Sequence, residues 1–492
     1  MQEEYLSPCI IICDNIRMNY KNNTQLILNI RKIKKEVFDM VDLKINIPED
    51  VQDVISQLED AGYTAYIVGG CVRDAVMGKQ PHDYDICTSA TPEEMMGVFS
   101  DRDVIETGLK HGTITVKGMD DFYEVTTYRI DGEYLDGRHP ESVQFVDNIE
   151  ADLARRDFTI NAMAYNSKTG FIDPFGGIED IQKKIIRCVG NPDKRFNEDA
   201  LRIMRAVRFS AVCDFKIEDE TKQSMFRNKN LLEQVSAERK TSEFCKMLRV
   251  AKFDLLNDYK DIFATFIPEL KDSFYFNQNN WHHKYDVYEH MMHSVDLAPN
   301  DLLIRLSLFF HDIGKPSVYT EDEKGVGHFY GHPSVSEEMT EKIMRRMKFD
   351  TNSIRKVTEL VSAHDIEPSD SLKFTRKMLN RFGEEQLRRL IVIEECDKGA
   401  QTENKDSIQS LKNLKIVREN IDKVLQEKEC FSIKNLALNG NDLKEMGIQP
   451  GIFMGKILNH LLEKVMENPK DNNKETLNKF VNEFIKENDI ER

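Results

Sequence analysis

Two closely spaced carboxylates have the residue types and spacing of a metal site. Asp83 and Asp85 lie two residues apart in the stretch HDYDI. On a β-strand both would point to one face, so they would repel each other without a cation between them. Such a pair suits two Mg²⁺ ions that activate an attacking hydroxyl and stabilise a leaving pyrophosphate. Glu124, in the nearby run EVTTYR, is the candidate third carboxylate. The alternative is a pair of solvated loop residues.

A glycine turn precedes this pair. Gly69 and Gly70 follow the apolar run YIV, and Arg73 lies one turn into the expected helix. Glycines let backbone N–H groups approach a phosphate, a helix N-terminus favours an anion, and a guanidinium adds a fork of donors. The other interpretation is a tight turn with a surface arginine. Together with the carboxylates downstream, the turn indicates nucleotidyl transfer.

A third cluster has the chemistry to read the edge of a base. Asp199 and Arg202 are three residues apart and would share one helix face. An acceptor beside a bidentate donor suits the edge that cytosine and adenine share, an exocyclic amine next to a ring nitrogen, and the wrong base would leave buried polar groups unpaired. Arg205 and Arg208 continue the spacing and would neutralise a triphosphate. The alternative is a basic amphipathic helix with local ion pairs.

Four sequence blocks contain these residues. They are VGGCVRDAVMGKQPHDYDI, LARRDFTINAMAY, IDPFGGIEDI and NEDALRIMRAVRFSA. In this order they resemble the class II tRNA nucleotidyltransferase and bacterial poly(A) polymerase family. The resemblance implies an α+β chain with a polymerase-β-like nucleotidyltransferase head and a mixed sheet. It also implies that Asp83 and Asp85 hold Mg²⁺, that Gly70 and Arg73 hold the triphosphate, and that Arg156 contacts the nucleotide. Asp157 would read the ribose.

A second set of metal-ligand residue types lies further along the chain. Its members are His290, His311, Asp312, His332, His364 and Asp397. Imidazole and carboxylate suit a divalent metal, of an identity that the sequence leaves open, which would activate water against a phosphoester. Asp312 would bridge two metals, and Lys315 would bind the substrate phosphate. The order H…HD…D resembles the HD phosphohydrolase superfamily, which implies phosphatase or 2′,3′-cyclic phosphodiesterase action. Some HD domains are chiefly structural. Three further histidines of this region are assigned structural or surface roles: His282, His283 and His293.

Composition describes an ordinary globular protein rather than a disordered or membrane one. The chain has 492 residues, a net charge of −17, 40% hydrophobic and 31% charged residues. Any contact with nucleic acid must therefore use a local basic surface, because the global field repels phosphate. Residues 181–260 hold 18 Lys and Arg against 12 Asp and Glu, a net charge of +6. This basic stretch fits phosphate contacts in one channel.

The sequence contains no targeting or membrane signal. The longest apolar runs are far shorter than the roughly 18 residues that span a bilayer, and the N-terminus MQEEYLSPCIIICDN lacks the regions of a secretory signal. Nine cysteines, without a CxxC pair, indicate reduced thiols. We therefore expect a cytoplasmic protein with no membrane partner.

Periodicity divides the chain into a mixed α/β part and a helical part. A helix is expected from Pro48 to Gly62, then a strand at Tyr66–Gly70 and further β-rich runs, with helices taking over from Asp180. The expected domains are an N-terminal extension at 1–39, the head at 40–180, a helical neck at 181–275, an HD domain at 276–400 and a helical tRNA-binding tail at 401–492. The tail's role is implied by the family only.

The sequence thus predicts a template-independent enzyme that adds CCA to the 3′ end of tRNA from CTP and ATP. The segment 131–145, DGEYLDGRHPESVQF, resembles the family's flexible loop that helps to switch specificity from C to A. A-only addition or poly(A) tailing is the first alternative. The second alternative is an HD phosphohydrolase in which the head is an RNA-binding module. The oligomeric state stays open.

Overall fold

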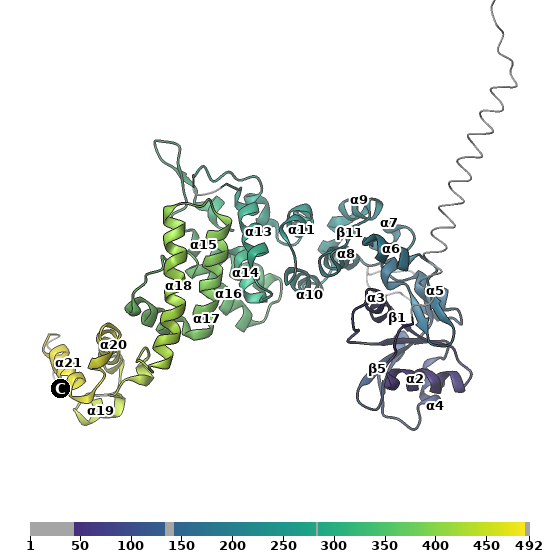
Figure 1. The fold of residues 1–492 in the computed structure, drawn as a ribbon, viewed down its shortest axis with the longest axis horizontal. Helices are drawn as coiled ribbons and strands as arrows, with labels where there is room; N and C mark the ends of the chain where they lie inside the picture. The colour runs from purple at the N-terminus through teal and green to yellow at the C-terminus, as the bar shows by residue number, and fades with distance from the viewer. Residues whose placement is uncertain (1–43, 133–141, 282–283, 488–492) are drawn as a thin grey trace, which may run out of the picture. The chain divides into compact units, whose positions relative to one another are not determined.

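The chain folds into two compact units. The computed structural model describes residues 44–132, 142–281 and 284–487, and its ribbon is drawn in Figure 1. Contacts divide the chain into Met1–Val235 and Ser236–Arg492, so the division falls inside the predicted neck. The predicted extension, most of the 131–145 loop, and the pair His282 and His283 lie outside the described residues.

A seven-stranded mixed sheet is the centre of the first unit. Its strand order is β3-β4-β5-β2-β1-β8-β9. The strands β1 and β2 are antiparallel, whereas β2 and β5 are parallel, which confirms the predicted mixed sheet. The strands are β1 (Ala65–Val68), β2 (Asp85–Thr88), β3 (Val104–Gly108), β4 (Thr113–Lys117), β5 (Phe122–Thr127), β8 (Ala164–Asn166) and β9 (Gly170–Ile172). A separate pair is β6 (Arg129–Asp131) with β7 (Val143–Phe145).

Amphipathic helices pack around this sheet. In the first helix Val51, Val54, Ile55 and Leu58 recur at helical spacing and are fully buried. The helices of the unit are α2 (Glu49–Asp60), α3 (Gly70–Val76), α4 (Pro92–Val98), α5 (Ile149–Ala154), α6 (Gly177–Lys183), α7 (Pro192–Glu198), α8 (Leu201–Cys213) and α9 (Asp219–Asn228). The neck is not wholly helical, because β10 (Ile185–Ile186) pairs in parallel with β11 (Lys216–Ile217).

The second unit is mainly helical. Its helices are α10 (Ala237–Leu248), α11 (Phe253–Asp258), α12 (Lys260–Phe263), α13 (Val287–Leu297), α14 (Leu302–Phe310), α15 (His332–Arg346), α16 (Thr351–Ala363), α17 (Leu372–Ala400), α18 (Lys405–Gln426), α19 (Gly440–Glu445), α20 (Ile452–Glu467) and α21 (Lys474–Glu487). One hairpin, β12 (Thr320–Glu321) with β13 (Gly327–His328), departs from the all-helical expectation. No helix in the described ranges is long and apolar enough to cross a bilayer.

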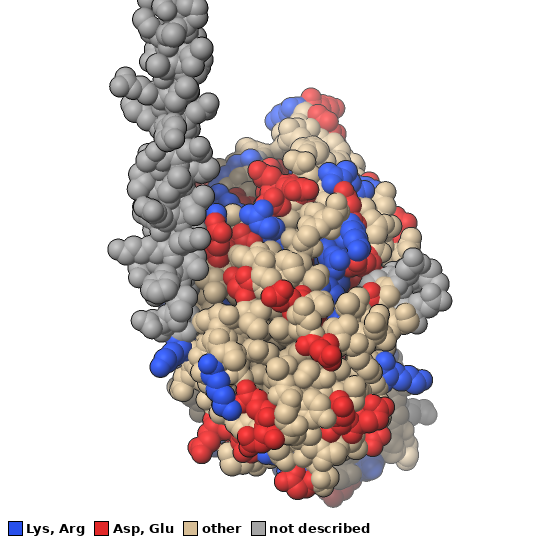
Figure 2. Space-filling model, turned by 90° about the vertical axis from the view of Figure 1, so that its right-hand side faces the viewer, with Lys and Arg blue, Asp and Glu red and all other residues tan. Residues whose placement is uncertain are grey.

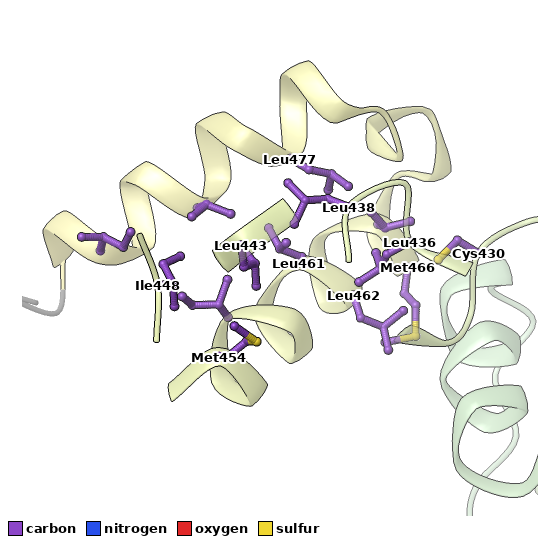
Figure 3. Close-up of a cluster of buried hydrophobic side chains, with 14 residues drawn as sticks. Cys430, Leu436, Leu438, Leu443, Ile448, Met454, Leu461, Leu462, Met466 and Leu477 are labelled. Atoms are coloured by element: carbon purple, nitrogen blue, oxygen red, sulfur yellow. The ribbon is translucent and has the colours of Figure 1, made fainter. Parts of the chain in front are cut away.

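The C-terminal helices bury their own apolar cluster, shown in Figure 3. Leu443 comes from α19, Leu461 from α20 and Leu477 from α21, and all three side chains are fully buried. Ile457, Leu461 and Val465 of α20 are also buried in this cluster, so this side of the helix is a packing face.

One buried carboxyl interrupts the apolar packing between α17 and α18. Glu394 is 4% exposed, lines a cavity of about 10 Å³ with side chains such as Leu390 and Val417, and its Oε2 has no hydrogen-bond partner. Burial raises the pKa of Glu394 well above its ordinary value of 4.5, while Lys398 lowers it. A carboxyl in such surroundings is favoured in its neutral form.

We predict that Glu394→Gln removes a pH-dependent cost of folding. Because the pKa is raised in the folded chain, the unfolded carboxyl ionises first as the pH rises above 4.5, and stability falls. Each pH unit between the unfolded and folded pKa costs about 1.4 kcal/mol. Urea unfolding of the second unit from pH 4.5 to 8 should show a growing advantage of the variant.

The matched control for this prediction is Glu395→Gln. Glu395 is the next residue on α17, and its carboxylate pairs with Arg418 at 2.7 Å near the surface. Its variant should give a pH curve that runs parallel to that of the parent protein. A parallel curve for Glu394→Gln as well would contradict the prediction.

Candidate functional site

An arginine-rich cavity of about 460 Å³ opens in the first unit. All residues that the sequence predicted to bind the nucleotide line it, together with Asp85. Its lining consists of Gly69, Gly70, Arg73, Asp85, Arg155, Arg156, Asp157, Asn161, Asp199, Arg202, Arg205, Arg208 and Phe209. Neither Asp83 nor Glu124 belongs to this lining. The structure therefore brings together residues from β2, from the turn before α3, and from α8.

The predicted carboxylates lie at the ends of neighbouring strands. Asp85 is the first residue of β2, and Asp83 precedes the strand, so the expectation that both stand on a strand is wrong. The two carboxylates nonetheless interact electrostatically. Burial and the negative charge of Asp83 raise the pKa of Asp85, while the positive charge of Arg156 lowers it. Since Ile86 pairs with Val125, Glu124 lies beside Asp85 on the adjacent strand. This donor set fits divalent cations.

The glycine turn is required by its backbone and by a close contact. Gly69 has φ of +75°, and a Cβ at this position would lie 2.9 Å from Nη1 of Arg156. A side chain here would therefore be strained and would displace a cavity arginine. Gly69 caps α3, and Arg73 on that helix donates to Asp74 at 2.8 Å and to Asn161 at 2.8 Å.

Buried carboxylates hold the other arginines in place. Asp152, with no exposed surface, accepts from Arg155 at 2.8 Å and from Arg156 at 3.4 Å. Asp157 accepts from Arg205 at 2.7 Å. Burial raises the pKa of each carboxyl, but the neighbouring guanidinium groups, Arg155 and Arg205 foremost, bring it below the ordinary value. Both carboxylates are therefore ionised partners of the arginines at neutral pH.

The predicted base-reading pair does not share a helix. Asp199 lies between α7 and α8 with an extended backbone (φ −148°, ψ 103°), and its Oδ1 accepts from the N–H of Leu201 at 3.0 Å. Arg202 is on α8, where it donates to Glu198 at 2.6 Å. The single-helix expectation is wrong, because the chain bends at Asp199 before α8 begins. Both residues still line the same cavity.

Sequence reasoning missed three side chains of this cavity: Arg155, which pairs with Asp152, and two uncharged residues. Asn161 joins Arg73 to Asp157, with contacts of 2.8 and 3.2 Å. Phe209 lies under the guanidinium groups of Arg205 and Arg208. Both stand inside blocks that the resemblance singled out, ARRDFTINA and RAVRFSA, but an uncharged side chain carries no sign of its role.

The predicted HD residues converge in the second unit. Two groups of possible metal ligands share one carboxylate: His290, His311 and Asp312 form the first group, and Asp312, His332 and His364 form the second. All six predicted residues are buried, and Oδ1 of Asp397 accepts from Nε2 of His290 at 2.8 Å. This geometry agrees with the prediction that Asp312 bridges two positions.

The hydrogen bonds of the histidines point their lone pairs inward. Nδ1 of His332 lies 2.9 Å from the carbonyl of Phe329, and Nδ1 of His364 lies 2.7 Å from that of Val361. Nδ1 must donate to these carbonyls, which leaves each Nε2 as an acceptor. The two Nε2 atoms are 3.1 Å apart, and Oδ1 of Asp312, which has no hydrogen-bond partner, lies 3.2 Å from His332. Three converging lone pairs fit a cation.

The group of His290, His311 and Asp312 differs from the second group in the charges around its carboxylate. Burial lowers the pKa of His311, but Asp312 and Asp397 outweigh it and raise the value to about 10. Nζ of Lys315 lies 2.7 Å from Oδ2 of Asp312 and 3.1 Å from Oε1 of Gln278. Lys315, expected to bind a substrate phosphate, is thus 5% exposed and engaged with the bridging carboxylate.

His293 has the structural role that the sequence assigned to it. Its ring stacks on Phe253, with centroids 3.7 Å apart, and on Tyr285 at 4.0 Å.

On the face drawn in Figure 2, acidic and basic side chains are interspersed rather than gathered into one basic field.

Three family models match separate parts of the chain. Residues 65–187 match the poly(A) polymerase head domain, and residues 214–273 match the "Probable RNA and SrmB- binding site of polymerase A". Residues 320–481 match tRNA nucleotidyltransferase domain 2, across the predicted boundary between the HD domain and the tail. The fold and the arginine-lined cavity thus define a nucleotidyltransferase-type head.

Known proteins resemble the chain in sequence and in fold. The CCA-adding enzyme of Lactobacillus helveticus is 50% identical over 194 residues, 39% of this chain and 48% of the relative, and that of Geobacillus stearothermophilus is 49% identical over 200 residues, 41% and 49%. The chain spans about half the length of these curated relatives. The Bacillus stearothermophilus CCA-adding enzyme in complex with CTP superposes with a TM-score of 0.67 and 28% identity, over 90% of this chain and 99% of that one. Over these regions the chain is similar to tRNA nucleotidyltransferases and poly(A) polymerases.

We predict that the second unit binds a divalent transition metal and that His364→Ala weakens this binding. The variant removes one of the converging lone pairs. Metal at a hundredfold excess over Kd should stabilise the parent protein by about 2.7 kcal/mol and the variant by much less. Thermal shifts with Mn²⁺ or Zn²⁺, and the bound metal measured by mass spectrometry, check this.

His293→Ala is the control for the metal prediction. It removes a stacked histidine of the same unit that is outside the ligand groups, so it should lower stability without reducing bound metal. Equal metal content in all three proteins would contradict the assignment.

Proposed function

We propose that this chain adds C, C and A to the 3′ end of tRNA from CTP and ATP, without a nucleic-acid template. The carrying observation is the arginine-lined cavity beside Asp85, which gathers every residue predicted to bind the nucleotide. A structural relative of 28% identity was solved with CTP, and several sequence relatives are CCA-adding enzymes. A-only addition and poly(A) tailing use the same chemistry and are the alternative products.

The cavity residues have distinct roles in this proposal. Arg73, Arg205 and Arg208 bind the triphosphate, because guanidinium forks match phosphate oxygens. Asp83 and Asp85 hold Mg²⁺, with Glu124 beside them. When bound, Mg²⁺ would activate the 3′ hydroxyl and stabilise the pyrophosphate that leaves. The hydroxyl attacks the α-phosphorus, one phosphoester bond forms, and the bond to pyrophosphate breaks.

The base and the tRNA are recognised by other parts of the chain in this proposal. Asp199 and Arg202 read the edge shared by cytosine and adenine. Arg156 contacts the nucleotide. Asp157 binds the ribose and also holds Arg205, from which it accepts a hydrogen bond. The helical tail at 401–492 binds tRNA. Three of its described helices, α19, α20 and α21, bury a common apolar core.

Sequencing of 3′ ends tests the product. The protein is incubated with Mg²⁺, all four nucleoside triphosphates and tRNAs that end before C, after C and after CC. We expect completion to CCA from each start. Addition of A only to the CC-ending tRNA, or long A tails, would replace the proposed product, and no extension would refute the function.

We predict that Asp85→Asn lowers the rate of incorporation by about a thousandfold, the equivalent of about 4 kcal/mol of lost metal-assisted stabilisation. Asp103→Asn is the control, since that exposed carboxylate of the same unit pairs with Lys117 at 3.0 Å. Single-turnover incorporation of CMP measures the effect. Incorporation that persists in Asp85→Asn would refute the metal assignment.

We propose metal-dependent phosphohydrolysis as a second activity, in the second unit. The supporting observation is the shared carboxylate Asp312 between two groups of buried histidines. A bound divalent metal would supply a nucleophilic hydroxide at neutral pH. The histidine Nε2 atoms would bind the metal. Gln401 donates to both oxygens of Asp397 at 3.2 Å and would orient that carboxylate.

We expect His311→Ala to abolish metal-dependent hydrolysis of bis-p-nitrophenyl phosphate and of 2′,3′-cyclic AMP. The same variant should retain CMP incorporation, whereas Asp85→Asn should show the reverse pattern. This double dissociation assigns each activity to its own unit. Undiminished hydrolysis in His311→Ala would refute the second activity.

A further inference from the structure

Three guanidinium groups surround a single aromatic ring in the cavity of the first unit. The guanidinium carbons of Arg73, Arg205 and Arg208 lie 5.2, 5.2 and 4.0 Å from the centroid of Phe209. The ring is 4% exposed and lines the cavity, and its other contact is the fully buried Phe158, with centroids 5.8 Å apart. Phe209 therefore connects the apolar core to the cavity arginines.

The polar contacts of these arginines complete a closed circuit. Arg73 donates to Asn161, Asn161 donates to Asp157, and Asp157 accepts from Arg205. Phe209 joins the two ends, because Arg73 and Arg205 both lie 5.2 Å from its centroid. These contacts connect α3 with α8. The guanidinium groups of Arg73 and Arg205 are therefore held by hydrogen bonds on one side and by the ring of Phe209 on the other.

An aromatic ring and a carboxylate contact different parts of a guanidinium group. A carboxylate binds the N–H edge of a guanidinium, and that edge is what recognises phosphate oxygens. The negative face of a ring attracts the cation without accepting those hydrogen bonds. Three cations can thus be held near one another by a group that accepts none of their N–H donors. A carboxylate at position 209 would also cancel positive charge in the cavity.

We propose that Phe209 is a positioning residue for the triphosphate, which acts by holding Arg73, Arg205 and Arg208 in a convergent arrangement through cation–π attraction. This inference rests on the proposed nucleotidyl transfer. Phe209 touches no reacting atom and acts through the arginines. Its substitution should therefore weaken binding of the triphosphate more than it slows the chemical step.

A fluorination series at position 209 tests the proposal. Replacing Phe209 by mono-, tri- and pentafluorophenylalanine keeps the shape of the ring but progressively removes its negative face. Calorimetry with inorganic tripolyphosphate should show affinity that falls step by step, by about tenfold at the pentafluoro variant. KM for CTP should rise in the same order, with a smaller change in kcat. Phe209→Leu should bind at least as weakly.

Two controls separate this mechanism from packing. The melting temperature without ligand reports any loss of packing against Phe158, and a packing role would not follow the order of fluorination. Equal tripolyphosphate affinity across the fluorinated series, with the parent protein binding normally, would overturn the role of Phe209 alone. If the parent protein bound neither CTP nor tripolyphosphate, the nucleotidyl-transfer proposal would fail and this inference with it.

Discussion

Crowding of like charges is the constraint on which the first unit depends. Six arginines line one cavity, and the unit must hold them together before any anionic substrate arrives. Carboxylates in and around the cavity offset this repulsion: Asp152 pairs with two arginines, Asp157 with Arg205, and Glu198 with Arg202. The net charge of −17 is thus compatible with phosphate binding, because the acidic groups here restrain the basic ones.

The second unit has the opposite arrangement, since it gathers acceptors instead of donors. Backbone carbonyls fix the Nδ1 atoms of His311, His332 and His364, which turns their Nε2 atoms toward Asp312. In one group Nζ of Lys315 lies 2.7 Å from Oδ2 of Asp312, whereas the other group leaves Oδ1 of Asp312 without a hydrogen-bond partner. The two groups should therefore differ in their demand for a cation.

The sequence predicted the membership of both sites better than their geometry. Ordered motifs placed every nucleotide-binding candidate in one cavity and every HD candidate in one cluster, because chemistry restricts residue type and spacing. Periodicity could not show that the chain bends at Asp199, since one backbone torsion interrupts an otherwise helical pattern. It also could not find Phe209 or Asn161, whose roles arise from neighbours far away in sequence. Domain limits were the least predictable, because the neck divides at Val235 without a change in composition.

The bend at Asp199 bears on the reading of the base that we propose for Asp199 and Arg202. On a single helix, the side chains of Asp199 and Arg202 would be neighbours on one face, where carboxylate and guanidinium pair with each other. Instead, the N–H of Leu201 fixes the carboxylate of Asp199, and Glu198 with the carbonyls of Arg195 and Arg155 fixes the guanidinium of Arg202. A rigid acceptor and a rigid donor penalise a mismatched base through unpaired polar groups. The junction between α7 and α8 therefore suits discrimination better than the continuous helix that the sequence suggested.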